Sequence, residues 1–439
     1  MSKRLVILGA GESGASAARL GQREGYDVFV SDAGAGNDTY LAELREAGIE
    51  FETGGHSRHR LLQADVVVKS PGIPDTANII KMIDQAGILI VSEIEFAFRY
   101  VAQDATIVGI TGSNGKTTTT MLTHHLLQTA GERVMAGGNL GDSFARLLVD
   151  HEPQDIYVLE LSSFQLDGIV DFRPDIATIL NITPDHLDRY EYKLEKYADS
   201  KFRIARRQRA SDHLLILDDP ETIAPARRRN KTEAAVTVID PEKDIDGSRI
   251  TVQEQVFDLS GSSLRGRHNA MNALFAVRIA LLLNVSPEEI RVGLESFVPA
   301  AHRMEVIPTT DGRTWINDSK ATNVDSTYFA LEAMDGPTVW IAGGTDKGND
   351  YAPLRELLNG KVHTLICLGV DNKKLKEAFA DIDRVVECQS AERAVELARE
   401  YAGAGDRILL SPACASFDLF KNYMDRGDQF REHVKRQVA

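Results

Sequence analysis

The sequence is poor in cysteine and has no long apolar run. Its three cysteines, Cys367, Cys388 and Cys414, are widely spaced and form no C-x-x-C pair, which excludes a disulfide framework and a cysteine-rich zinc site. The apolar stretch at residues 5–11 is too short for a signal peptide, and no stretch reaches the roughly 20 apolar residues that span a bilayer. We therefore expect a cytoplasmic protein with no membrane partner.

The sequence also lacks an excess of positive charge. Its 65 Asp and Glu residues outnumber its 50 Lys and Arg residues, which leaves a net charge of −15. Such a field repels nucleic acids. The basic clusters Arg206–Arg209 and Arg227–Lys231 have no aromatic residues between their charges, so they are more typical of solvated surfaces than of nucleic-acid sites. We expect no nucleic-acid partner, and any bound anion must be held by local groups.

Short apolar runs alternate with amphipathic stretches along the whole chain. The runs are RLVILG, DVFVSD, DVVVKS, ATIVGI, IYVLEL, ATILNI, HLLILD, PTVWIAGG, HTLICLG and RILLSP. Alternation of this kind predicts an α/β fold built on parallel sheets. The segments AAVTVID and SRITVQEQVFDLS have a different pattern and predict small antiparallel strands that decorate the middle of the chain.

The length and the breaks in this pattern predict three domains. At roughly 150 residues per domain, a chain of 439 residues holds about three. We expect a Rossmann-like domain at 1–97, a P-loop ATPase-like domain with the antiparallel addition at 98–300, and a second Rossmann-like domain at 301–439.

A glycine-rich loop follows the first predicted strand. The residues Gly9-Ala10-Gly11-Glu12-Ser13-Gly14 open a helix, and Asp32 ends the next strand. Small residues there let backbone N–H groups approach a diphosphate, and nothing in the pattern demands nicotinamide. A second turn, Ser70-Pro71-Gly72-Ile73, ends another strand, where ligands of open α/β sheets bind.

A second loop, TGSNGKTTT, lies between the strand ATIVGI and a helix. In this setting it predicts a triphosphate cradle, with Lys116 on the β and γ phosphates of ATP and the Thr117 hydroxyl on Mg²⁺. The strict Walker A pattern requires glycine at position 110, where this chain has Ile110, and the earlier loop glycine is Gly112 instead. Two phosphate loops suggest a nucleotide substrate in addition to ATP.

Three further side chains could complete this site. Glu160 ends the strand IYVLEL and offers the hard oxygen ligand that Mg²⁺ favours. His186 follows the strand ATILNI; a lone histidine in such a loop is more often a surface residue or a helix cap than a ligand. By its pattern alone, Lys201 is a solvated helix lysine.

Five motifs of the second and third predicted domains resemble the Mur ligase family of peptidoglycan synthesis, and the resemblance extends in order over all three domains. They are TGSNGKTTT, ELSSFQL, NITPDHLDRY, NDSKATN and SPACASFD, and the last two resemble the members that join D-glutamate to UDP-N-acetylmuramoyl-L-alanine. The resemblance implies a monomeric cytoplasmic enzyme that uses ATP and two Mg²⁺ ions to form an acyl phosphate, which the amino group of D-glutamate attacks.

The same resemblance implies roles for individual residues. The catalytic groups would be Lys116, Glu160, His186 and Lys201, with Thr117, Glu160, His186 and a carbamylated Lys201 as metal ligands. The ATP contacts would be Gly112, Ser113, Asn114, Gly115, Lys116, Thr117, Thr118, Asn269, Asn272, His302, Arg303, Asp318 and Lys320. The UDP-substrate contacts would be Gly11, Glu12, Ser13, Asp32, Ser70, Gly72, Asn139 and Ser162. The D-glutamate contacts would be Thr322, Lys347, Ser416, Phe417 and Tyr423.

Two sets of residues depart from the family pattern. Ala33-Gly34 replaces side chains that touch uracil, so uracil recognition would depend more on backbone groups. Tyr423 and Phe417 stand where a familiar member has Phe and Leu, which keeps the bulk and changes the local hydrogen bonding.

Two other classes of protein stay open on the motifs alone. A nicotinamide-dependent oxidoreductase would use GAGESG but would give the second loop no role. A regulatory P-loop ATPase would use TGSNGKTTT but would need no amino-acid pocket.

Overall fold

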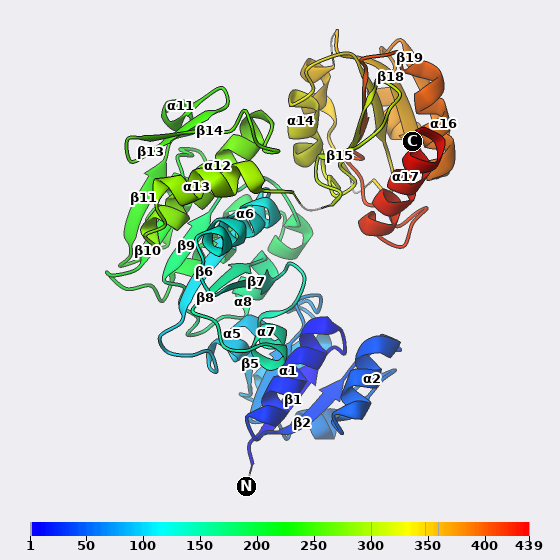
Figure 1. Cartoon of the computed structure of the whole chain (residues 1–439). Helices are drawn as coiled ribbons and strands as arrows, with labels where there is room; N and C mark the ends of the chain where they lie inside the picture. The colour runs from blue at the N-terminus through cyan, green and yellow to red at the C-terminus, as the bar shows by residue number, and fades with distance from the viewer. Residues whose placement is uncertain (1, 300, 347, 359, 439) are drawn as a thin grey trace. The chain divides into compact units, whose positions relative to one another are not determined.

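The computed structural model describes residues 2–299, 301–346, 348–358 and 360–438. The chain forms two compact units, the first made of residues 1–244, 251–256 and 272–294 and the second of residues 245–250, 257–271 and 295–439 (Figure 1). The first two predicted domains both lie largely in the first unit, and the third lies in the second. The exact domain limits at 97 and 300 stay predictions.

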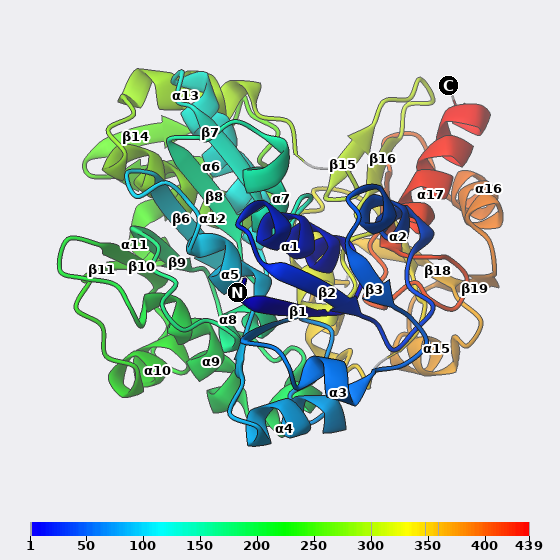
Figure 2. The same ribbon diagram turned by 90° about the horizontal axis from the view of Figure 1, so that it is seen from below.

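The N-terminal sheet of the first unit has the strand order β3-β2-β1-β4-β5, and its strands pair in parallel. Its strands are β1 (Arg4–Leu8), β2 (Asp27–Ser31), β3 (Glu50–Glu52), β4 (Val66–Lys69) and β5 (Leu89–Val91). Its helices are α1 (Glu12–Arg23), α2 (Asp38–Glu46), α3 (Arg58–Leu61), α4 (Asn78–Gln85) and α5 (Glu93–Phe98). Successive residues of a strand face opposite sides: Leu5 and Ile7 pack with α1, and Val6 and Leu8 pack with α3 and α4 (Figure 2).

The second sheet of this unit has the order β11-β10-β9-β6-β8-β7 and is also parallel. Its strands are β6 (Thr106–Thr111), β7 (Val134–Gly138), β8 (Ile156–Glu160), β9 (Ile176–Ile179), β10 (His213–Leu217) and β11 (Ala235–Ile239). Its helices include α6 (Lys116–Thr129), α7 (Phe144–Asp150), α8 (Ser163–Asp167), α9 (Leu194–Phe202) and α10 (Ile223–Arg229), with the short 3-10 helices η1 (Leu187–Tyr190) and η2 (Arg203–Ala205). Helix α6 covers one face, and α9 and α10 cover the other (Figure 2).

One strand prediction is wrong. AAVTVID forms β11, which pairs in parallel with β10 at the edge of the large sheet. The helix α10 between the two strands makes a β-α-β crossover, which requires parallel pairing, and the alternating polarity reflects an edge strand that is partly solvated. The antiparallel expectation holds for the next segment, where β12 (Ile245–Asp246) pairs with β13 (Arg249–Val252) beside β14 (Gln255–Asp258).

Three helices flank this small sheet in the sequence: α11 (Pro241–Asp244), α12 (Gly266–Leu282) and α13 (Pro287–Ser296). Of these, α12 is the element that brings a predicted ATP contact to the phosphate loop of the first unit.

The sheet of the second unit has the order β15-β16-β20-β17-β18-β19 and is parallel except for the β15–β16 pair. Its strands are β15 (Glu305–Ile307), β16 (Thr314–Asn317), β17 (Thr338–Ala342), β18 (Val362–Leu368), β19 (Arg384–Cys388) and β20 (Arg407–Leu410). Its helices are α14 (Val324–Glu332), η3 (Ala352–Leu357), α15 (Lys373–Ala378), α16 (Ala391–Tyr401) and α17 (Tyr423–Val438). Trp315 packs on the side of α16 and α17, and Trp340 on the side of α14.

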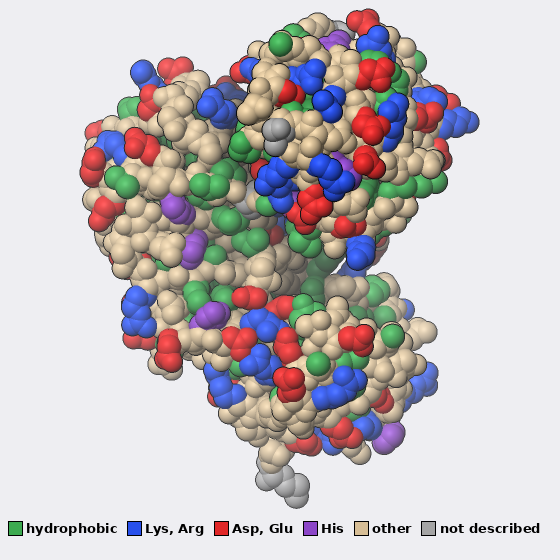
Figure 3. Space-filling view, turned by 45° about the vertical axis from the view of Figure 1, so that its right-hand side comes forward, with side chains coloured by type: hydrophobic (Ala, Val, Ile, Leu, Met, Phe, Trp, Pro, Cys, Tyr) green, Lys and Arg blue, Asp and Glu red, His purple; other side chains and the backbone are tan. Residues whose placement is uncertain are grey.

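The α/β fold with mainly parallel sheets is therefore confirmed, and each apolar run named above contains a strand. Among the described residues, no helix combines the length and the apolar character needed to cross a bilayer. On the face in Figure 3, basic side chains lie among acidic ones instead of forming one continuous positive surface.

Two buried glutamates in α5 have opposite environments. Burial raises the pKa of Glu93 to about 8, although its carboxylate accepts one bond from the Ala145 N–H. Glu95 is also fully buried, but its Oε2 accepts the N–H groups of residues 170–172 at 2.8–2.9 Å and its Oε1 accepts from Arg99 at 3.2 Å. One carboxyl group is thus held in its neutral form, and the other is surrounded by donors.

These environments predict opposite effects of two isosteric substitutions. The carboxyl of Glu93 binds its proton up to about pH 8 in the folded chain but only to about 4.5 when unfolded, so wild-type stability falls as the pH rises across this interval. Glu93→Gln cannot ionise, so we expect similar stability at pH 5 and a gain of about 1–3 kcal/mol at pH 8. Glu95→Gln should lose about 1–3 kcal/mol at pH 8, because it leaves donors unpaired. Urea unfolding midpoints at both pH values test this, and a Glu93→Gln effect that does not change with pH would contradict it.

Candidate functional site

The N-terminal glycine loop is built by close backbone contacts. Gly9 has φ 96°, and a Cβ at Gly14 would lie 1.9 Å from the Gly9 carbonyl oxygen, so both positions require glycine. Asp32 fixes the loop, since its carboxylate accepts from the N–H groups of Ala10 and Gly34, each at 2.7 Å. A Cβ at Gly11 would meet open space. The loop therefore presents the start of α1 to a ligand at Gly11.

Two predicted substrate contacts on this loop have internal partners. The Glu12 carboxylate accepts from the Ser143 N–H at 3.1 Å and forms an ion pair with Arg146 at 3.0 Å. Ser13 donates to Glu12 at 3.4 Å. In the structure the Glu12 side chain connects α1 with the start of α7, and a Cβ at Gly11 would face open space.

The second glycine loop is also held by side chains that a sequence motif does not contain. Gly115 has φ 82°, and a Cβ there would lie 2.3 Å from Asn272 Oδ1, so the predicted ATP contact Asn272 does lie beside the loop. Asn181 Oδ1 accepts the Asn114 N–H at 2.8 Å, and Ser113 Oγ donates to the Thr183 carbonyl oxygen at 3.0 Å. The loop is thus fixed from the segment that follows β9.

Thr117, at the start of the helix that follows the loop, lies close to Glu160 and Asn139. Thr117 Oγ1 donates to Glu160 Oε2 at 2.6 Å, and Asn139 Nδ2 donates to Glu160 Oε1 at 2.8 Å. Glu160 is only 3% exposed at the end of β8. Hydroxyl and carboxylate oxygens at this position are ligands of the kind that Mg²⁺ takes.

Two lysines meet at one carbonyl oxygen of the same loop. Lys116 Nζ lies 2.9 Å and Lys201 Nζ 2.8 Å from the Gly112 carbonyl oxygen. Lys201 is 1% exposed, and its Nζ lies 4.4 Å from the centre of the Tyr197 ring. Burial, together with the Lys116 charge, holds the pKa of Lys201 well below its ordinary value. The solvated helix lysine expected from the pattern alone is in fact a buried amine.

A cavity of about 210 Å³ collects most of the predicted catalytic groups. Its lining comprises Pro71, Gly72, Lys116, Asn139, Ser162, Ser163, Phe164, Asp185, His186, Tyr197 and Lys201. His186 lies 3.5 Å from Asp185 and edge-on to Phe164, and its side chain is 48% exposed. The lining thus joins predicted substrate contacts (Gly72, Asn139 and Ser162) to the phosphate loop.

The donor set fits a metal ion only in part. Among the residues that the structure describes, no three His, Cys, Asp or Glu side chains converge as a ready-made metal site. The neutral or protonated Lys201 amine offers no oxygen ligand. Thr117 and Glu160 do supply oxygens, and a carbamate on Lys201 would add two more in the same region.

Sequence reasoning missed Asn181, Asp185 and Arg189 as members of this site. The Arg189 guanidinium lies over the Phe164 ring at 4.3 Å and donates to the carbonyl oxygen of Pro71 at 3.4 Å. All three belong to the motif NITPDHLDRY, so the motif signalled their region, but only the fold shows which atoms they touch.

The second unit brings another group of predicted residues together. Lys320 Nζ donates to the Tyr423 hydroxyl at 3.0 Å and lies 4.1 Å from the centre of that ring. Asp318 is buried, which raises its pKa to about 7, and it accepts from Ser411 Oγ at 2.9 Å. Because the Tyr423 phenol is uncharged, it does not neutralise Lys320, whose charge can still attract an anion.

The remaining predicted residues of this unit have varied settings. His302 is buried beside Asn317, with 3.0 Å between its Nδ1 and the Asn317 amide nitrogen. Ser416 is buried, Thr322 is partly buried, and Phe417 is 70% exposed. Asn269 donates to the Arg265 carbonyl oxygen at 2.9 Å. Arg303 contributes positive charge near Asp318, and Lys347 lies outside the described residues.

Arg426, which no motif singled out, holds two predicted loops in place. It is 1% exposed and donates to the Ser319 carbonyl oxygen at 2.9 Å, to Ser319 Oγ at 3.0 Å and to the Cys414 carbonyl oxygen at 3.3 Å. Ser319 belongs to NDSKATN and Cys414 to SPACASFD, so one planar guanidinium fixes the segments that carry Lys320 and Ser416.

Three family models match the chain in order. They are "Mur ligase MurD-like, N-terminal domain" at residues 3–92, "Mur ligase middle domain" at 110–280 and "Mur ligase, glutamate ligase domain" at 302–414.

Two curated relatives are similar over almost their full lengths, and both are named UDP-N-acetylmuramoylalanine--D-glutamate ligase. The protein of Christiangramia forsetii is 47% identical, with 99% of this chain and 100% of the relative covered. The protein of Cytophaga hutchinsonii is 45% identical, with 99% of both chains covered.

Two solved structures share the fold. MurF from Acinetobacter baumannii has a TM-score of 0.65 at 18% identity and covers 97% of this chain and 93% of its own. UDP-N-acetylmuramate-alanine ligase MurC from Thermotoga maritima has a TM-score of 0.62 at 17% identity, with 99% of both chains covered.

The contacts of Arg426 predict that lysine cannot replace it. The ammonium of a lysine cannot make all the hydrogen bonds that the planar Arg426 guanidinium donates to the two loops. Arg426→Lys should therefore cost about 2–4 kcal/mol of unfolding free energy. Arg431 on the same helix is the matched control, since it pairs with Glu305 at the rim and Arg431→Lys keeps that charge pair, for a cost below about 1 kcal/mol. Chemical denaturation of both variants measures the difference, and equal losses would refute a special role for Arg426.

Proposed function

The chain belongs to the Mur ligase family, and we propose that it joins D-glutamate to UDP-N-acetylmuramoyl-L-alanine with ATP, in peptidoglycan synthesis. The observation that carries this proposal is the meeting of Lys116, Lys201 and the Thr117–Glu160 pair around one glycine loop, at a cavity that also includes predicted UDP-substrate contacts. Relatives at 45–47% identity with this printed activity support the choice of substrates.

The reaction must make a poor electrophile reactive. The substrate carboxylate attacks the γ-phosphorus of ATP, the bond to ADP breaks, and an acyl phosphate forms. The glutamate amine, having lost a proton, then attacks the acyl carbon, and phosphate leaves as the amide forms. Little covalent chemistry falls to the protein, so its residues act by positioning the reactants and by neutralising charge.

Within the first unit the roles follow from the contacts. Lys116 already points its ammonium at the carbonyl oxygens of Gly112 and Ser113 and would turn it to the phosphates. When bound, Mg²⁺ would neutralise phosphate charge. Thr117, Glu160, His186 and a carbamylated Lys201 would hold the metal, two ions in all.

Two positive lysines at this site would repel each other and a metal cation. Carbamylation of Lys201 would replace one of these positive charges with a negative one. A neutral amine attacks the carbon of CO₂, an N–C bond forms and one proton leaves. The product is an anion with two oxygens. The low pKa of Lys201 supports this step, because it favours the neutral, nucleophilic amine.

We assign the other predicted residues as the resemblance implies. The adenosine part of ATP would meet Asn269, Asn272, His302, Arg303 and Asp318, and Lys320 would contact phosphate. D-Glutamate would meet Thr322, Lys347, Ser416, Phe417 and Tyr423. The UDP substrate would meet Gly11, Glu12, Ser13, Asp32, Ser70, Gly72, Asn139 and Ser162, with Asn139 near its muramoyl peptide. We further propose three domains with limits at 97 and 300 and a monomeric, cytoplasmic enzyme.

An acceptor panel tests the proposed function. With UDP-N-acetylmuramoyl-L-alanine and MgATP present, ADP release should depend on D-glutamate and should be at least about 10²-fold slower with L-glutamate, D-aspartate or L-alanine, because a site built for one dicarboxylate leaves polar groups unpaired with the others.

The control is Lys116→Ala, which removes the ammonium that would contact the transferred phosphoryl group. It should lower the rate at least about 10²-fold, while the unfolding midpoint stays near wild type. Equal turnover of L-glutamate, or ADP release without any acceptor, would contradict the assignment. The second result would favour a regulatory ATPase.

A further inference from the structure

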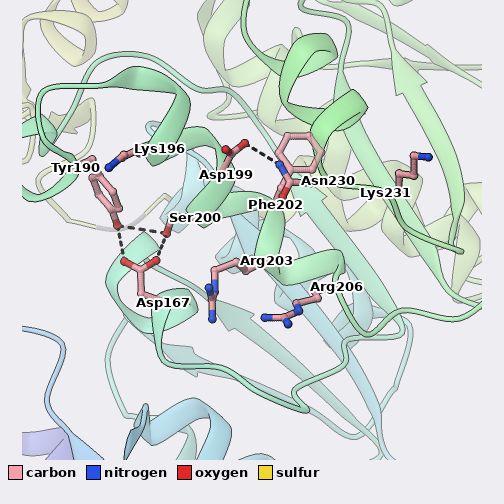
Figure 4. Close-up of a pocket in the computed structure, with 10 residues that line it drawn as sticks. All are labelled: Asp167, Tyr190, Lys196, Asp199, Ser200, Phe202, Arg203, Arg206, Asn230 and Lys231. Atoms are coloured by element: carbon pink, nitrogen blue, oxygen red, sulfur yellow. Dashed lines mark hydrogen bonds between the residues drawn. The ribbon is translucent and has the colours of Figure 1, made fainter. Parts of the chain in front are cut away.

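Asp167, the last residue of α8, accepts hydrogen bonds from two other elements. The Tyr190 hydroxyl donates to its Oδ2 at 2.8 Å, and the Ser200 hydroxyl to its Oδ1 at 2.7 Å (Figure 4). Tyr190 ends η1, and Ser200 lies in α9. One carboxylate therefore ties three separate elements together.

Each of these elements is next to a predicted metal ligand. Helix α8 follows Glu160 at the end of β8, η1 begins directly after His186, and Ser200 precedes Lys201 in α9. The three ligands come from different parts of the chain, so their relative positions depend on contacts between these elements. Asp167 supplies two of those contacts.

The hydrogen bonds are sheltered and well defined. Tyr190 is 7% and Ser200 4% exposed. Burial raises the pKa of the Tyr190 phenol, so the hydroxyl remains a donor. Its ring stacks at 6.3 Å on Phe164, which borders the catalytic cavity. The Ser200 hydroxyl also lies 3.1 Å from the Ser163 carbonyl oxygen, a second contact with α8.

Helix α9 contributes residues to two cavities. Tyr197 and Lys201 line the cavity of about 210 Å³. Asp199 and Ser200 of the same helix line a second cavity of about 430 Å³, together with Asp167, Tyr190 and Arg203 of η2 (Figure 4). Tyr197, Ala198 and Phe202 pack the helix into the core, and the polar bonds of Ser200 add contacts on the side of the second cavity.

We propose that Asp167 is a positioning residue that, through Tyr190 and Ser200, holds α9 so that Lys201 stays at the Gly112 carbonyl beside Lys116. This inference rests on the proposed function, since it assigns Lys201 to the metal site. It predicts that loosening α9 weakens the response to Mg²⁺ more than it weakens binding of the acceptor, because the predicted glutamate contacts lie in the second unit.

The test uses the full-length enzyme and three variants: Asp167→Asn, Tyr190→Phe and Ser200→Ala. Each should lower kcat about tenfold or more and raise the Mg²⁺ concentration for half-maximal rate several-fold, with the KM for D-glutamate unchanged, since small displacements of reacting groups carry such costs. The rise in unfolding temperature on addition of MgCl₂ and ADP, a readout without turnover, should shrink in all three.

Two further variants separate positioning from folding. Asp199→Asn is the matched control, because Asp199 lies on the same helix and the same cavity but accepts from Arg229 and Asn230, at 2.8 and 2.7 Å. It should leave the Mg²⁺ response unchanged. Ser200→Thr keeps the hydroxyl and should restore most of what Ser200→Ala loses. Tyr190→Phe and Ser200→Ala should also be non-additive, because both act through one carboxylate.

The outcomes are distinct. If the three variants lower the unfolding temperature but keep the wild-type kcat, Mg²⁺ dependence and MgADP stabilisation, Asp167 only supports the fold and the inference is wrong. If wild type makes no amide from glutamate, the proposed function fails instead, and the inference is then decided by MgADP stabilisation of wild type against the three variants.

Discussion

The structure depends most on the approach of two lysine side chains to one carbonyl oxygen. Lys116 and Lys201 both donate to the Gly112 oxygen, at 2.9 and 2.8 Å, from different helices. Two ammonium groups so close repel each other, and for a nearly inaccessible Lys201 burial adds to that cost. The site tolerates this arrangement only if one of the two lysines loses its positive charge. In our account Lys201 does so, first as a neutral amine and then as a carbamate anion.

The surrounding structure keeps the two amines at that oxygen. The loop that presents the Gly112 carbonyl needs glycine at position 115, where a Cβ would meet Asn272, and Asn181 binds the loop from the other side. Below it, Thr117 and Glu160 supply the oxygens that a cation needs. Asp167 then connects α9 to α8 and η1, so backbone geometry and buried polar bonds together fix the charges.

Sequence patterns predict features that depend on residues close together in the chain. They do not predict contacts between segments that are far apart in the chain. The long buried strands, and the place of TGSNGKTTT between a strand and a helix, follow from local patterns and are confirmed. The pattern of AAVTVID could not show that a crossover helix makes β11 parallel to β10. The ion pair of Glu12 with Arg146, the bridge made by Arg426 and the contacts of Asp167 all join segments far apart in the chain, and no spacing rule encodes them.

The most direct test of carbamate formation on Lys201 is ¹³C NMR of the protein equilibrated with ¹³C-bicarbonate at mildly alkaline pH. The account predicts one carbamate resonance in wild type that is absent in Lys201→Arg and persists in Lys116→Ala, since burial lowers the pKa of the Lys201 amine and so favours the form that reacts with CO₂. Identical spectra for wild type and Lys201→Arg, with wild type active under the same conditions, would contradict it.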